Sequence, residues 1–173
     1  NGLKAYEEVV RSDNAELLEC IFPLIIDDIR KRNMDKEGSY GLLHLAATGS
    51  PKCLDLLLAR KEMTISEICN SRDRSSALHF AVMSDKPDNV RILLRHGANV
   101  NQADAYGNTP LHLAASKGQV KMCRMLIEFG AKKDRQNKDE STPEDVAEME
   151  NHRAVLMHLP EIDSYLWGFG VLG

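Results

Sequence analysis

The sequence is poor in aromatic residues, which make up 5% of its 173 residues. Large sandwich cores and base-stacking surfaces depend on aromatic side chains, so both are disfavoured. Long apolar runs are also missing, because the longest one, from Ile21 to Ile26, is far too short to span a bilayer. The net charge of −4 disfavours general attraction to nucleic acid or to an anionic membrane. With 43% hydrophobic and 28% charged residues, the composition is that of a folded globular chain.

The sequence also lacks the cysteine patterns of metal or disulfide frameworks. It has no Cys-x-x-Cys pair and no Asn-x-Ser/Thr glycosylation site. Reduced thiols are therefore expected, and with them a cytoplasmic or nuclear location. Because residue 1 is Asn rather than Met, we also expect the sequence to be part of a longer polypeptide. The four cysteines are Cys20, Cys53, Cys69 and Cys123.

Catalytic motifs are absent as well. The sequence contains no Gly-x-Ser-x-Gly, no glycine-rich phosphate loop and no His-Glu-x-x-His. Nothing in it predicts a carboxylate with a raised pKa. We therefore expect no enzyme activity, catalytic residue, cofactor, metal ion or small-molecule substrate.

What the sequence does contain is an internal repeat. The segment Thr109–Ala115 reads Thr-Pro-Leu-His-Leu-Ala-Ala and has two earlier copies, Ser76–Val82 and Gly41–Ala47. From copy to copy the aligned histidine advances by 35 and then by 33 residues. A Gly-Ala pair that follows the pattern recurs after 33 residues, at Gly97 and Gly130. Two landmarks with nearly the same period indicate repeated structural units. The aligned histidines are His44, His79 and His112.

Three apolar columns extend the repeat to five units. The first column is Leu18, Leu54, Val90, Cys123 and Leu156. The second is Ile21, Leu57, Leu93, Leu126 and Leu159. The third is Val9, Ala46, Ala81, Ala114 and Ala147. The columns predict one domain over residues 1–159, with units at about 4–37, 38–70, 71–103, 104–136 and 137–159, followed by a tail at 160–173.

The period and the pattern Thr-Pro-Leu-His-x-Ala resemble the ankyrin repeat, from about Lys4 to Leu159. The resemblance implies an all-α solenoid of helix-turn-helix units joined by short β-hairpin loops. It also gives the repeated histidine a structural role, as a hydrogen-bond partner of the backbone between units. Local chemistry agrees, because Thr109-Pro110 places a capping hydroxyl before a proline that suits the first helical position.

For function, the resemblance implies a non-enzymatic module that binds another protein or peptide through its loops and its inner-helix groove. The candidate binding residues are those outside the recurring core. Exposed aromatic and Met side chains are frequent anchors in protein interfaces, and Arg can bind a carboxylate or phosphate. The candidates are Tyr40, Arg72, Arg74, Met83, Tyr106, Asn108, Ser116 and Lys117.

Alternative functions remain open from the sequence. The segment could regulate or target a larger enzyme or an E3-type complex. A nucleic-acid-associated role is less favoured, since it would depend on few cations and oppose the net charge. Those cations are Arg72, Arg74, Lys132, Lys133 and Lys138.

Two further features lie near the C-terminus. Residues 139–150 contain six acidic residues and no Lys or Arg, which fits either a helix start and a polar end cap or a docking patch for a basic partner. The tail carries Tyr165, Trp167 and Phe169. It could fold back over the last helix pair, begin a neighbouring segment or insert into a partner.

Overall fold

The computed structural model shows two compact units, Asn1–Asn99 and Val100–Gly173, each of which is described by itself. All regular secondary structure in the described residues is helical, apart from an isolated bridge at Ser76, which confirms the predicted all-α class. None of the described helices is long and apolar enough to cross a membrane. The described residues are 8–10, 12, 14–24, 42–49, 51–60 and 73–158.

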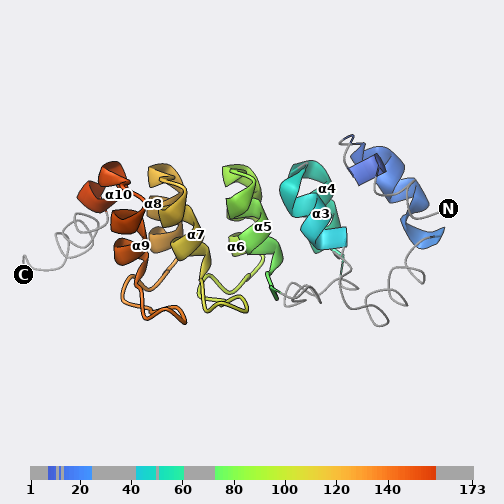
Figure 1. Cartoon of the computed structure of the whole chain (residues 1–173). Helices are drawn as coiled ribbons and strands as arrows, with labels where there is room; N and C mark the ends of the chain where they lie inside the picture. The colour runs from blue at the N-terminus through green and yellow to red at the C-terminus, as the bar shows by residue number, and fades with distance from the viewer. Residues whose placement is uncertain are drawn as a thin grey trace, which may run out of the picture. The chain divides into compact units, whose positions relative to one another are not determined.

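The first unit consists of short helices that pack in pairs (Figure 1). The first helices of successive pairs, α3 and α5, lie side by side, and so do the second helices, α4 and α6. This is the arrangement that a repeated helix-turn-helix pattern predicts. The helices are residues 8–10 and 15–24, α3 (Leu42–Thr48), α4 (Pro51–Leu58), α5 (Ala77–Met83) and α6 (Pro87–Arg95).

The core of the first unit is built from the recurring columns. Ala46 and Ala81 are fully buried, and their small side chains let neighbouring first helices approach closely. The large residues of the second helices are at most 1% exposed, which corresponds to about 1.5–3 kcal/mol of hydrophobic stabilisation for each. Those residues are Leu54, Leu57, Val90 and Leu93.

The second unit repeats the plan. The first helices α7 and α9 lie side by side, and α10 packs against both α8 and α9 (Figure 1). Ala114, Ala147 and Leu126 are fully buried, as their columns predict. The helices are α7 (Pro110–Ser116), α8 (Val120–Glu128), α9 (Pro143–Met149) and α10 (Arg153–His158).

The columns fail at the two ends of the described helices. In α10 the buried residue is Val155, whereas the column residue Leu156 is half-buried. In helix 15–24, Phe22 is 2% exposed and the column residue Ile21 is half-buried. Leu18, the other column residue of helix 15–24, is fully buried, so only one column position departs from the prediction in each of these two helices.

Candidate protein-binding surface

The loop before α7 and the loop before α9 each contain the same type of hydrogen-bonded turn. The Asp104 carboxylate accepts the backbone N–H groups of Tyr106 and Asn108, both at 2.8 Å, and the Asp104 N–H donates to the Asn108 carbonyl. Asn137, which lies 33 residues later, accepts the N–H groups of Asp139 and Ser141 in the same way. The chain reverses direction where the β-hairpin loops were expected. Each turn is closed by hydrogen bonds to an Asp or Asn side chain, and neither loop contains a β-strand.

The two loops of the second unit are also bonded to each other. The Lys138 N–H donates to the Tyr106 carbonyl at 3.0 Å, and the Asn137 side-chain amide donates to the Asn108 side-chain oxygen at 2.9 Å. Gly107, which lies between Tyr106 and Asn108 in the sequence, has φ +81°, and a Cβ atom at this residue would lie 2.9 Å from the Lys138 nitrogen. The backbone of this loop is therefore fixed, while the Tyr106 side chain is 61% exposed.

His112 links α7 to the following loop. Its Nδ1 accepts the Thr109 N–H at 3.1 Å, and its Nε2 lies 3.1 Å from the Ser141 carbonyl oxygen. Because a carbonyl can only accept, the ring proton is on Nε2. Burial lowers the pKa of His112, which favours this neutral ring. The structural role that the resemblance implied is thus confirmed for His112.

In the first unit the repeated histidine is buried as well. His79 is fully buried, and its Nδ1 accepts the Ser76 N–H at 3.1 Å. His44 meets the Phe80 ring edge to face, with 5.3 Å between ring centroids. In the described part of the chain, no three His, Cys, Asp or Glu side chains are grouped so that they could hold a metal ion.

The candidate residues of the second unit lie at both ends of α7. Tyr106 and Asn108 are in the loop before it, where the Asn108 side chain is engaged by Asn137. Ser116 and Lys117 are at its C-terminal end, where the Ser116 carbonyl accepts a hydrogen bond from the His152 ring at 2.9 Å. Of these four candidates, Tyr106 and Lys117 are exposed and the other two are half-buried.

The first unit places two further candidates at its surface. Arg74 is exposed and has φ +49°, in the loop position that Gly107 occupies one repeat later. Met83, the last residue of α5, is 45% exposed. Tyr40 and Arg72 lie outside the described residues.

Sequence reasoning missed a column of apolar residues on the first helices. These residues follow the repeated histidine, or its equivalent Asp145, and all of them are half-buried. An apolar side chain at this position in four of the five repeats, with Glu8 in the first, is a signal that the column comparison could have found. Together with exposed Met149, 74% accessible, they add apolar area to the first-helix face. The column is Leu45, Phe80, Leu113 and Val146.

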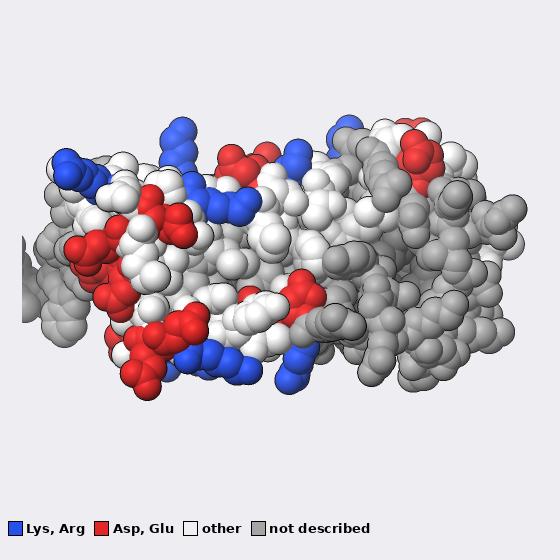
Figure 2. Space-filling view, in the orientation of Figure 1, with Lys and Arg blue, Asp and Glu red and all other residues white. Residues whose placement is uncertain are grey.

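A run of exposed carboxylates covers α9 and the loop before it, at the end of the second unit that Figure 1 colours orange to red (Figure 2). The Asp145 carboxylate accepts hydrogen bonds from the Thr142 hydroxyl and N–H, both at 2.7 Å, and these bonds lower the pKa of Asp145. Part of the run therefore caps the helix, as expected. The exposed carboxylates are Asp139, Glu140, Glu144, Asp145, Glu148 and Glu150.

Paired short helices, alanines buried between first helices and a repeated buried histidine, which in His112 is bonded to the following loop, define an ankyrin-repeat fold. A family model described as ankyrin repeats (three copies) matches residues 9–104, 42–137 and 101–161. The chain belongs to the ankyrin-repeat family.

Several curated proteins are similar over part of their length. Human protein phosphatase 1 regulatory subunit 27 is 42% identical over 71 residues, 41% of this chain and 46% of that protein. The E3 ubiquitin-protein ligase KEG of Arabidopsis thaliana is 30% identical over 130 residues, 75% of this chain and 8% of that protein. Human SH3 and multiple ankyrin repeat domains protein 2 is 29% identical over 151 residues, 85% of this chain and 8% of that protein. The chain thus spans less than half the length of each.

Proposed function

We propose that the chain is a non-enzymatic module that binds a partner protein through its loops and first-helix faces. The observation that carries the proposal is the exposure of Tyr106 on a loop whose backbone is fixed by hydrogen bonds to the next loop. An aromatic side chain on a fixed backbone loses little conformational entropy when a partner binds it. Membership of the ankyrin-repeat family, whose members generally bind proteins, supports the same function.

The first-helix face supplies the rest of the surface in each unit. In the first unit, exposed Met83 lies at the end of α5 and Arg74 in the loop before it. In the second unit, Leu113 on α7 and Val146 on α9 add half-buried apolar area, while exposed Tyr106 and Lys117 lie before and after α7. Apolar anchors with charged residues nearby are a common composition for a protein interface.

The test is capture of a partner by the immobilised chain from cell extract. Replacing Arg74, Met83 and Tyr106 together by Ala should abolish retention of the partner without changing the free energy of unfolding by more than about 0.5 kcal/mol, since the three side chains are exposed. A matched control variant replaces three exposed second-helix-side residues by Ala and should retain the partner. Equal retention by both variants would place the binding surface elsewhere. The control residues are Lys86, Lys121 and Glu128.

A second proposal is that the module regulates or targets a larger assembly. The names of two relatives support it, one being a regulatory subunit of a phosphatase and the other a ubiquitin ligase. Material retained on the immobilised chain would then carry phosphatase or ubiquitin-ligase activity, and the triple variant would lose that activity. Retained protein with neither activity would contradict this second proposal and leave the first one intact.

The nucleic-acid alternative has little support from the surface. Lys138 in the loop before α9 is directly followed by the exposed carboxylates of Asp139 and Glu140, which would repel phosphate. Binding to an oligonucleotide that weakens steeply with salt would revive it. A cytoplasmic or nuclear location remains a proposal from the cysteine content, and imaging of the tagged protein in cells would test it.

A further inference from the structure

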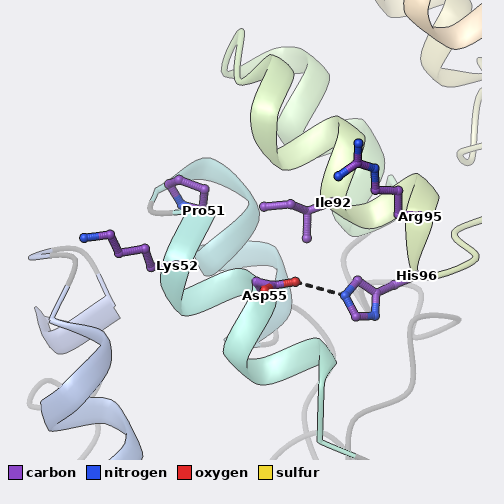
Figure 3. Close-up of a pocket in the computed structure, with 6 residues that line it drawn as sticks. All are labelled: Pro51, Lys52, Asp55, Ile92, Arg95 and His96. Carbon is purple, nitrogen blue, oxygen red and sulfur yellow. Dashed lines mark hydrogen bonds and ion pairs between the residues drawn. The ribbon is translucent and has the colours of Figure 1, made fainter.

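A shallow hollow lies between the second helices of the first unit, apart from the first-helix faces and loops (Figure 3). Its volume is about 310 Å³, close to the lower limit for a small ligand pocket. Pro51 and Asp55 line it from α4, and Ile92 lines it from α6. Both Pro51 and Ile92 are half-buried, so the hollow offers apolar contact area that a ligand could cover.

The carboxylate that lines the hollow, that of Asp55, already has a partner in His96. The Asp55 Oδ1 atom lies 3.0 Å from the His96 Nε2 atom, and this bond joins α4 to the end of α6. The two remaining charged residues of the lining are cations, Lys52 and Arg95, both exposed. Neither forms an ion pair with any residue in the described ranges. The hollow is therefore locally cationic in a chain with a net charge of −4.

The positions of the cations favour an extended ligand. In Figure 3, Arg95 lies on the α6 side of the hollow, whereas Lys52 lies at the outer edge of α4 with its ammonium group directed away from Ile92. An extended ligand can contact Ile92 in the middle and one cation on each side. A peptide segment can do so, with an apolar side chain on Ile92 and carboxylates directed to either side.

We propose that this hollow docks an acidic segment of a partner protein, one that presents carboxylates on either side of an apolar side chain. The observations behind it are the apolar floor, the engaged Asp55 and the two cations without a partner in the described residues. Charge complementarity of this kind selects the partner and its orientation. The proposal goes beyond binding through the first-helix faces and does not depend on it.

The test uses the full 173-residue chain and a defined probe. Amide chemical shifts of the ¹⁵N-labelled chain are followed during titration with the blocked peptide acetyl-ELDLE-amide. We expect shifts at Asp55, Ile92 and His96, and a several-fold loss of affinity between about 50 mM and 500 mM NaCl. The uncharged peptide acetyl-QLNLQ-amide should bind at least about threefold more weakly, because each exposed ion contact contributes modestly.

Two variants separate the proposal from a structural role. The double variant Lys52→Glu, Arg95→Glu should abolish the shifts, whereas Lys121→Glu, Lys132→Glu, with the same change of net charge on exposed residues elsewhere, should keep them. Asp55→Asn preserves an oxygen that can accept the His96 hydrogen bond but removes the competing negative charge, so it should tighten binding about twofold. Tighter binding is an effect that loss of structure cannot produce.

Three results would overturn the proposal: shifts confined to residues outside the hollow, equal binding of the acidic and uncharged peptides, or no binding at millimolar peptide. Binding of the oligonucleotide dT8 at the hollow in preference to the acidic peptide would assign it to nucleic acid instead and would also refute the proposal. None of these outcomes affects the triple variant of the first-helix face, so the two proposals fail separately.

Discussion

Asn89 is a buried polar residue that joins two repeats of the first unit. Its side-chain amide in α6 lies 2.8 Å from the Ala47 carbonyl, 3.1 Å from that of Gly49 and 3.3 Å from that of Ala46. These carbonyls lie at the end of α3, where the helix leaves its last acceptors without intrahelical donors. Asn89 is 1% exposed, so its amide is shielded from solvent in the folded chain.

The magnitude of the effect follows from the number of donors. The amide has two hydrogens, so it makes about two full hydrogen bonds, each with a net contribution of about 1 kcal/mol. Removing the donor also leaves buried acceptors unsatisfied, which costs about 1–3 kcal/mol. We therefore expect Asn89→Ala to lower the free energy of unfolding by about 2–4 kcal/mol.

Asn89→Asp separates hydrogen bonding from packing. The side chain keeps its size, so no cavity forms, but a carboxylate oxygen replaces the donor and faces the carbonyl oxygens of Ala46 and Ala47. At about pH 7.5 the loss should be at least as large as that of Asn89→Ala, because a buried unpaired charge is strongly destabilising. Burial raises the pKa of the new carboxyl in the folded state. The loss is therefore greatest above that pKa and shrinks as the pH falls through it.

The assay is urea unfolding followed by far-ultraviolet circular dichroism, with each variant compared with the parent chain at the same pH. The difference between Asn89→Asp and the parent should decrease between about pH 7.5 and pH 4.5. A loss below about 0.5 kcal/mol for Asn89→Asp at neutral pH would refute the reasoning, since that is the size of an ordinary surface substitution.

Three further predictions concern single residues. Gly107→Ala should lower the free energy of unfolding by at least about 1–2 kcal/mol, measured by urea unfolding. The alanine would have to adopt a positive φ, and its Cβ would lie too close to the Lys138 nitrogen. Arg74 already has a Cβ at a positive φ, so Arg74→Ala should change the free energy of unfolding by less than about 0.5 kcal/mol. The pKa of His112 is lowered in the folded state, so below about pH 6.5 the unfolded chain binds more protons than the folded chain. The contribution of His112 to stability is therefore full above about pH 6.5 and falls as the pH decreases below it. In thermal melts, His112→Gln should lose less stability than the parent chain between about pH 7.5 and pH 5.5. Burial raises the pKa of Cys123 to about 12, so mass spectrometry after iodoacetamide treatment of the folded chain should find Cys20, which is exposed, labelled well before Cys123.

The fold was predictable because residues at the same repeat positions form the core in successive repeats. Ala81 and Ala114 recur where first helices approach, and Leu93 and Leu126 recur between second helices, so one period showed both the elements and their burial. The prediction failed for Leu156, which is half-buried, whereas its neighbour Val155 is buried. A periodic pattern shows which positions recur, but it does not show which of two adjacent apolar residues in α10 is the buried one.

The candidate surface was predictable only in part. Exposure of Tyr106 and Met83 followed from their place outside the core columns. The engagement of Asn108 by Asn137 did not, because it depends on the distance between two loops that are 29 residues apart in the chain. The role of Asn89 was not predicted for the same reason. Its partners are backbone carbonyl oxygens 40 to 43 residues earlier in the chain, and a sequence pattern does not show which backbone groups will need a donor.

The most direct test of binding through the first-helix face is photo-crosslinking in cells. The photoreactive residue p-benzoylphenylalanine is placed in turn at Tyr106, at Met83 and, as a control, at Lys121 on α8, all of which are exposed. We predict covalent adducts of the same partner protein from positions 106 and 83 and none from position 121. An adduct from position 121 alone, or equal adducts from all three positions, would contradict recognition through the loops and first helices.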